Sequence, residues 1–112
     1  MTVKLPNPDK AIIPRAKIEG YLLSPVHSVG RHKAAFFTSL GYTQAEWQAL
    51  AQDMRKLVIG DARPTEETEY GRKYEIRGQI TGPQRRVASI VTAWIVRHGE
   101  DFPRFITAYP ED

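Results

Sequence analysis

The stretch RVASIVTAWIVR at residues 86–97 decides the fold of this 112-residue chain. It is rich in β-branched side chains and apolar on both faces of an extended chain, which is typical of a strand in the centre of a sheet. Upstream, residues 74–80 alternate between apolar and polar side chains, and Gly82-Pro83 marks a turn between the two segments. Consecutive strands joined by short turns predict an antiparallel meander from about residue 61 onward.

The segment PRFITAYP at residues 103–110 predicts the closing strand of this meander, over 104–109. Pro110 cannot donate a hydrogen bond to a neighbouring strand, so the element should end there. Side chains alternate across a strand, which places Arg104, Ile106 and Ala108 on one face and Phe105, Thr107 and Tyr109 on the other. The first face suits a core, whereas the second, with its hydroxyl and phenol, is suited to contacting a ligand.

The first half of the chain shows helical periodicity. Three helices are predicted, over about 14–23, 29–40 and 43–60. Gly41 fits the left-handed conformation that closes many helices, and Thr43 with Glu46 predicts a capping box for the third helix. Helices followed by strands indicate an α+β fold, in which the three helices cover one face of the sheet. The side chains expected to be buried there are Phe36, Phe37, Trp47, Leu50 and Met54.

Length and composition predict a single domain over residues 1–112. The chain has no cysteine, which excludes disulfides and thiolate metal sites and suits a cytosolic interior. It contains no apolar run near the roughly 20 residues that span a bilayer, and its N-terminus lacks the apolar stretch of a signal peptide. We therefore expect a cytoplasmic protein with no membrane partner. The net charge of +3 favours anionic partners such as nucleic acid or an acidic protein, and homo-oligomerisation stays open.

Common catalytic motifs are absent from the sequence. The three histidines, His27, His32 and His98, have no recognised metal-ligand spacing. No nucleophile elbow, Gly-rich phosphate loop or pair of buried carboxylates can be identified. We therefore expect neither a metal nor a cofactor.

What remains is a set of His, Lys, Arg, Thr and Tyr side chains, which is sufficient to cleave RNA through its own 2′-hydroxyl. His27 could act as base or acid because an imidazole titrates near neutral pH. Lys33 could stabilise the charge of the transition state, and Tyr109 could stack on a base or donate a proton. Thr92 and Thr107 could orient phosphate oxygens.

Further side chains are candidates for binding substrate. They are Arg31 and His32 on the first turn of the second helix, Arg77 and Thr92 on the expected sheet, and Trp94, for which core packing is the alternative. Arg104 is an additional phosphate partner. Whether Thr92 and Trp94 share a face with Thr107 and Tyr109 depends on strand register, which the sequence does not fix.

Several motifs together resemble a small bacterial family, the domain of unknown function 6883. They run from Ile12-Ile13-Pro14 through His27-Ser28-Val29-Gly30-Arg31-His32-Lys33-Ala34 and Leu40-Gly41-Tyr42 to Val91-Thr92-Ala93-Trp94-Ile95 and the closing segment 103–110. The resemblance covers nearly the whole chain.

This family is similar to RNase toxins with the barnase/RelE-like fold, a fold-level analogy. The resemblance implies three N-terminal helices on one face of a four-stranded antiparallel sheet. It also implies a metal-independent endoribonuclease toxin that an antitoxin or immunity protein neutralises. His27 and Lys33 would then be the helix-borne catalytic residues, and Arg104, Thr107 and Tyr109 those of the last strand. Such toxins often carry a second catalytic histidine, for which His32 or His98 would have to serve.

Two other functions stay open. A non-catalytic module that binds nucleic acid or protein would bind RNA in a salt-dependent way without cutting it. A structural domain of a phage or secretion system would use the same motifs only to hold its fold.

Overall fold

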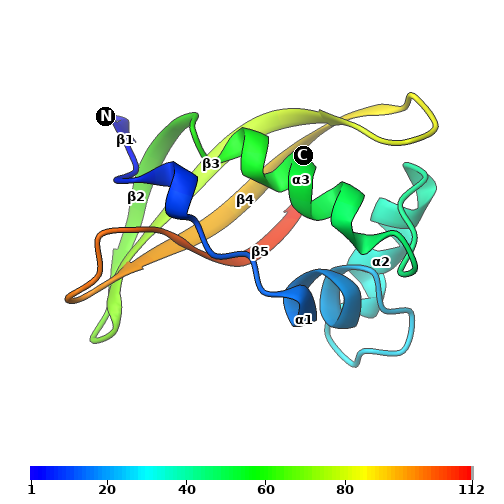
Figure 1. The fold of residues 1–112 in the computed structure, drawn as a ribbon, viewed down its shortest axis with the longest axis horizontal. Coiled ribbons are helices and arrows are strands. Elements are labelled where there is room, and N and C mark those ends of the chain that lie inside the picture. The colour runs from blue at the N-terminus through cyan, green and yellow to red at the C-terminus, as the bar shows by residue number, and fades with distance from the viewer. Residues whose placement is uncertain (112) are drawn as a thin grey trace.

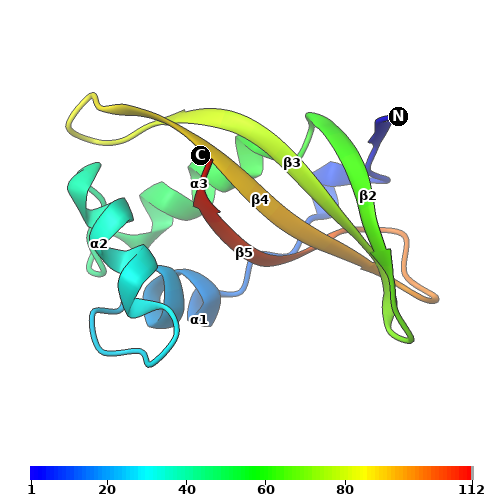
Figure 2. The same cartoon turned by 180° about the vertical axis from the view of Figure 1, so that it is seen from behind.

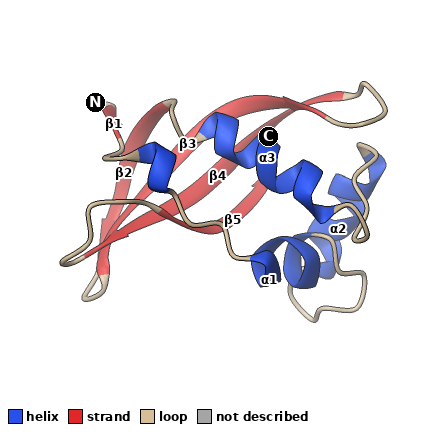
Figure 3. Cartoon of the chain, viewed as in Figure 1, coloured by secondary structure: helices blue, strands red, loops and turns tan. Residues whose placement is uncertain are grey.

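The computed structural model describes residues 1–111 (Figure 1). Its elements, in chain order, are β1 (Val3–Lys4), a 3₁₀ turn η1 (Pro8–Lys10), α1 (Arg15–Lys17), a π-helical turn η2 (Ile18–Leu22), α2 (Arg31–Ser39), α3 (Trp47–Leu57), β2 (Asp61–Glu67), β3 (Gly71–Thr81), β4 (Val87–Arg97) and β5 (Arg104–Pro110). Figure 3 shows α3 in front of the sheet and α1 and α2 toward the end of the sheet that lies away from β1. No helix among the described residues is long and apolar enough to cross a membrane.

The sheet has five antiparallel strands in the order β1-β2-β3-β4-β5. The expected four-stranded sheet with three N-terminal helices is therefore wrong. A short strand precedes the helices, because Val3 pairs with Ala62 and Lys4 with Asp61 at the edge of the sheet. Two residues are too few to display the alternation by which strands are recognised in a sequence.

The expected cover of three helices on one face also needs correction. Figure 1 shows α3 lying across one face of the sheet, and Figure 2 shows the opposite face open toward the viewer. The C-terminus of α2 instead packs against the β3–β4 turn, where the Arg86 side chain donates to the Ser39 carbonyl at 3.2 Å. The chain before α1 runs beside β5, because Ile12 forms an isolated parallel bridge with Arg104.

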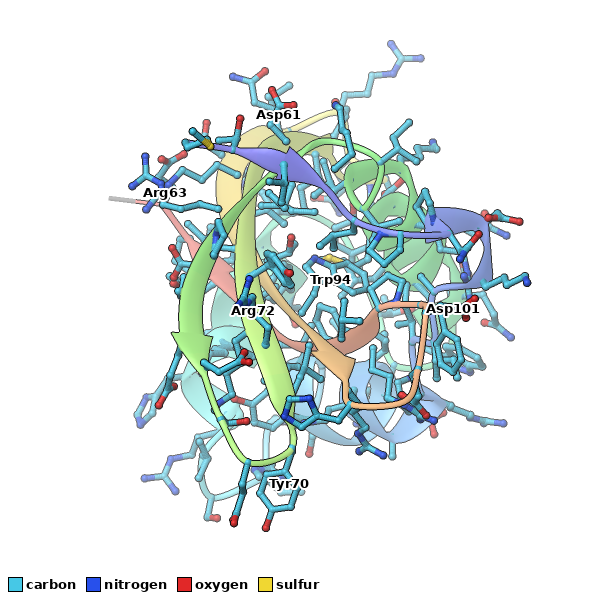
Figure 4. All side chains as sticks on the ribbon, turned by 90° about the vertical axis from the view of Figure 1, so that its left-hand side faces the viewer. Asp61, Arg63, Tyr70, Arg72, Trp94 and Asp101 are labelled. Carbon is cyan, nitrogen blue, oxygen red and sulfur yellow. The ribbon has the colours of Figure 1, made fainter. Side chains whose placement is uncertain are left out.

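The core lies between α3, the first helical turns and the inner face of the sheet. Phe37, Leu50 and Met54 are fully buried as expected, whereas Phe36 and Trp47 are only partly buried against the core. Trp94 lies at its centre, as the end-on view of Figure 4 shows, and its ring meets that of Phe105 edge to face at 5.3 Å. The apolar stripe of 86–97 thus anchors the fold.

A β-bulge in β5 breaks the expected alternation. Trp94 pairs with Phe105 and Ala93 pairs with Thr107, so Ile106 is an extra residue in its strand. Both Phe105 and Ala108 are buried as a result. The expectation that Phe105 shares a face with Thr107 is therefore wrong, since a bulge places two residues of one strand opposite one of the next.

The segment between α2 and α3 follows its sequence signals only in part. Gly41, which follows α2, has a φ of 101°, a conformation that favours glycine. The Thr43 hydroxyl accepts a hydrogen bond of 3.2 Å from the Glu46 amide, just before α3 begins at Trp47. The predicted capping box at the start of the helix is nevertheless wrong, because Glu46 is the N-cap residue of α3 and no side chain caps it.

Candidate active site

The hydroxyl of Tyr21 contacts one side chain from the helical half of the chain and one from the last strand. Tyr21 lies on η2, where its oxygen accepts a hydrogen bond of 2.9 Å from Lys33 Nζ on α2. The same oxygen accepts a second bond, of 3.3 Å, from Thr107 Oγ1 on β5. Two of the predicted catalytic side chains therefore meet on a phenol that the sequence did not single out.

His27 lies beside this phenol in the loop that leads into α2. Its ring stands edge to face with that of Tyr21, with 5.1 Å between the centroids. Its Nδ1 accepts hydrogen bonds from the amides of Val29 and Gly30, both at 3.0 Å. A neutral ring that accepts at Nδ1 carries its proton on Nε2, so His27 offers a hydrogen-bond donor at Nε2.

Gly30 brings the start of α2 against Tyr21. A Cβ atom at this position would lie 2.2 Å from the Tyr21 carbonyl oxygen, far inside van der Waals contact. Glycine is the residue that allows two backbone segments to approach this closely. The close approach keeps Tyr21, His27 and Lys33 in one cluster.

The groups around Tyr21 lower the pKa of its phenol. Partial burial on its own raises the pKa of the phenol, but hydrogen bonds from Lys33 and Thr107, together with the charges of Lys33 and Lys17, outweigh burial and lower the pKa below its usual value. The Nζ atoms of Lys17 and Lys33 lie 5.8 Å and 5.3 Å from the ring centroid. Within residues 1–111, neither lysine forms an ion pair with a carboxylate.

A surface groove of about 440 Å³ lies beside this cluster. It is lined by Pro14, Ala16, Lys17, Gly20, Tyr21 and His27. Lys33 and Thr107 are not among these lining residues. A ligand in the groove would lie against Tyr21 and His27, next to Lys17. This groove is the candidate active site.

Tyr109 on β5 and Arg77 on β3 lie on the outer face of the sheet, where both pair with Val91 of β4. The Tyr109 hydroxyl donates to Glu75 at 2.8 Å, and Arg77 binds Glu111 at 2.7 Å. Burial first, and then the hydrogen bond to Glu75, raise the pKa of Tyr109. The polar ends of both residues thus have carboxylate partners, and their contacts among the described residues do not include Tyr21.

Arg104 is also held by a carboxylate. Its Nε and Nη2 atoms each donate to Glu100 at 2.8 Å, in a two-pronged ion pair. The hydrogen bond to Arg104 is also the main cause that lowers the pKa of Glu100. Arg31 and His32 are exposed on the first turn of α2, where they line a second groove of about 750 Å³.

Thr92 and Trp94 face the core. Both are fully buried, with 0% of their surface exposed. Thr92 Oγ1 donates to the Ile76 carbonyl at 3.0 Å and accepts from the Trp94 indole at 2.8 Å. Thr107 and Tyr109 pair with Ala93 and Val91 and so lie on the opposite face of the sheet. The register thus separates the two sets, and Thr92 and Trp94 present no surface to a ligand.

Sequence reasoning missed Tyr21 and Lys17. Tyr21 recurs at helical spacing with Ile18 and Leu22, which is typical of a core stripe. The available signal was the spacing of Lys17, four residues before Tyr21, because such residues are neighbours on a helical surface. No group of three or more metal-ligating side chains occurs in the part of the chain that the structure describes.

Comparisons with known proteins place the fold and the family. The structure resembles a chain of the contact-dependent growth inhibition toxin–immunity protein complex from Klebsiella pneumoniae 342, with a TM-score of 0.68 and 16% sequence identity. The match covers 94% of this chain and 97% of that chain, so the two share a fold. No curated protein matches the chain. The model of the domain of unknown function DUF6883 matches residues 4–112, and the chain therefore belongs to that family, as its motifs predicted.

Proposed function

We propose that this chain is a metal-independent endoribonuclease that acts as a toxin and is neutralised by an immunity or antitoxin protein. The observation that carries the proposal is the meeting of Lys33 and Thr107 on the Tyr21 hydroxyl, beside the ring of His27 and at the edge of a groove. These side chains come from α2, β5 and the loop between η2 and α2, and the fold brings them together.

The chemistry of RNA suits such a site. The 2′-hydroxyl of RNA is a built-in nucleophile, so the protein has to stabilise charge on phosphorus and help protons move. The ammonium group of Lys33 would stabilise the developing negative charge. The Nε2–H group of His27 would donate to a phosphate oxygen, and the Thr107 hydroxyl would help to fix the geometry.

The remaining cations would guide the substrate. Arg31 and His32 are exposed near the start of α2, and the net charge of the chain is +3. Arg77 and Arg104 contribute less, because each is already paired with glutamate. An electrostatic attraction of this kind should weaken as salt increases.

The fold supports the toxin assignment by analogy. The similar structure from Klebsiella pneumoniae 342 is a complex of a contact-dependent growth inhibition toxin with an immunity protein. A likeness in fold leaves the activity to the site itself. For this chain, the site argues for the toxin role, because it gathers proton-transfer and cationic groups beside an open groove.

Expression of the chain alone tests this proposal. Wild-type protein should arrest bacterial growth, and the purified protein should cut single-stranded RNA in the presence of a chelator. Lys33→Met should lose both effects. Lys56→Met is the matched control, because Lys56 is an exposed lysine on α3 that pairs with Asp53 at 3.4 Å.

Other outcomes separate the alternatives. RNA binding that falls steeply with salt, without cleavage by wild-type protein, would favour a binding module instead. Normal growth on expression, with rescue of cells from a toxin encoded nearby, would assign the chain to the immunity side. Equal cleavage by wild-type protein and Lys33→Met would remove Lys33 from the mechanism.

A further inference from the structure

The geometry of the Tyr21 hydroxyl assigns it a chemical role within the proposed function, on which this inference rests. We propose that Tyr21 is the general acid of the site, a catalytic residue that gives its phenolic proton to the leaving 5′-oxygen of RNA.

The hydrogen bonds of the phenol carry the argument. Its oxygen accepts from Lys33 Nζ and from Thr107 Oγ1, at 2.9 Å and 3.3 Å. A phenolic oxygen that accepts two hydrogen bonds still has its own O–H group to donate. Tyr21 is one of the residues that line the groove, so a ligand bound there would lie against this side chain.

The surroundings of Tyr21 make it a better proton donor than an ordinary tyrosine. The groups that face it are Lys17 from α1, His27 from the loop, Lys33 from α2 and Thr107 from β5. Two of these are cations and none is a carboxylate. They stabilise the phenolate that remains after proton transfer, and they hold the pKa of Tyr21 below its usual value.

Tyr109 provides an internal contrast. Its hydroxyl donates to Glu75, so its proton is already engaged, and burial and the carboxylate together raise its pKa. A raised pKa makes a phenol a weaker acid. Of these two tyrosines near the last strand, Tyr21 is therefore the one suited to donate.

The proposed step transfers one proton from Tyr21 to the leaving group of RNA. The 2′-oxygen attacks phosphorus and forms the O2′–P bond, while its proton passes to solvent water. The P–O5′ bond breaks, and its electron pair goes to O5′, which takes the proton of Tyr21. The phenolate is held by the Lys33 ammonium group until it regains a proton from water, which leaves a 2′,3′-cyclic phosphate and a 5′-hydroxyl.

A change of leaving group tests the assignment. An oligoribonucleotide is made around a cut site mapped with wild-type protein, once with the natural 5′-oxygen and once with sulfur in its place. A thiolate leaves without protonation, so it needs no general acid. Tyr21→Phe should lose activity by about 100-fold or more on the oxygen substrate, as for other general acids. It should stay within a few-fold of wild type on the sulfur substrate.

Tyr70→Phe is the matched control, because Tyr70 is exposed on the β2–β3 turn, at the tip that Figure 4 shows. It should cut both substrates like wild type. The rate of wild-type protein on the oxygen substrate should fall as rising pH removes the phenolic proton, and this alkaline fall should be absent with sulfur.

The remaining outcomes each overturn a claim. An equal loss by Tyr21→Phe on both substrates would show a structural role, and no loss on either would exclude Tyr21 from the chemistry. If wild-type protein cuts neither substrate while still folded, the proposed function fails, and the assignment of Tyr21 fails with it.

Discussion

Thr107 on the last strand donates a hydrogen bond of 3.3 Å to the hydroxyl of Tyr21, a residue 86 positions earlier in the chain. The bulge at Ile106 makes this contact possible. Phe105 points into the core, so strict alternation would have sent Thr107 into the core as well. The extra residue turns Thr107 to the outer face, where η2 lies within reach.

Removal of the Thr107 hydroxyl should change the acidity of Tyr21. Thr107→Val keeps the shape of the side chain but removes one of the two hydrogen bonds that stabilise the phenolate, so the pKa of Tyr21 should rise. Nuclear magnetic resonance of ¹³C-labelled tyrosine measures it directly. Thr65→Val, at an exposed position on β2, is the control and should leave it unchanged. An unchanged pKa in Thr107→Val would contradict the hydrogen bond.

The contact between Gly30 and Tyr21 predicts an intolerance to any side chain. Gly30→Ala would place a Cβ atom 2.2 Å from a backbone oxygen, so the start of α2 must move away from η2. We expect a loss of about 1–3 kcal/mol in the free energy of unfolding, as for other overpacked sites. Gly20→Ala is the matched control, since a Cβ there meets nothing within 4 Å. Urea denaturation of both variants checks this, and equal stability would contradict it.

Thr92 should matter for stability rather than for substrate. Thr92→Val would remove the acceptor of the buried Trp94 indole N–H, and an unsatisfied buried donor costs about 1–3 kcal/mol. Urea denaturation should show this loss, whereas the RNA cleavage rate of the folded fraction should match wild type. A loss of cleavage at full stability would instead restore Thr92 as a substrate contact.

His27 accepts hydrogen bonds from two backbone amides before α2 and also lies in the candidate site, and two substitutions separate these roles. His27→Ala removes the acceptor of the Val29 and Gly30 amides, which should cost about 1 kcal/mol of stability. His27→Asn supplies another acceptor and should keep stability within about 0.5 kcal/mol of wild type. Both lose the Nε2–H donor, so both should lose RNA cleavage. Growth arrest that survives both changes would remove His27 from the mechanism.

The sequence predicted the parts of the fold that local patterns determine. The alternation in 74–80, the apolar stripe of 86–97 and the Gly82-Pro83 turn predict β3, β4 and their connection, because each signal lies within a few residues. The sequence did not predict β1, because its two residues form a strand only through their pairing with β2. The sequence did not predict the bulge at Ile106 either, because the bulge depends on the register between β4 and β5.

The residues of the candidate site also divide into those that the local sequence could predict and those that it could not. His27 and Lys33 could be selected by residue type, and Thr107 by its place on the last strand. Tyr21 could not be distinguished from a core residue, because its role depends on partners 12 and 86 positions away. Arg104 was predicted to be a phosphate partner. The sequence could not predict its ion pair with Glu100, because that pair depends on the conformation of the loop before β5.

Tyr42 gives the fold a predictable sensitivity to alkali. Its hydroxyl donates to Asp53, and burial first, then this carboxylate, strongly raise its pKa. The unfolded chain loses the phenolic proton near its ordinary pKa of about 10, whereas the native state keeps it. The native state then binds more protons than the unfolded state, so stability falls as pH rises above about 10, by up to about 1.4 kcal/mol per pH unit for this group.

Tyr42→Phe should remove this part of the alkaline loss. The variant lacks the hydrogen bond to Asp53 and should be less stable than wild type at pH 7, by about 0.5–1.5 kcal/mol. The difference in the free energy of unfolding should shrink as pH rises above about 10. Only the wild-type protein has a phenol that stays protonated in the native state while it ionises in the unfolded state, which lowers its stability. Urea denaturation of both proteins across this range measures the difference. A constant gap at all pH values would contradict the raised pKa of Tyr42, since the phenol would then ionise alike in both states.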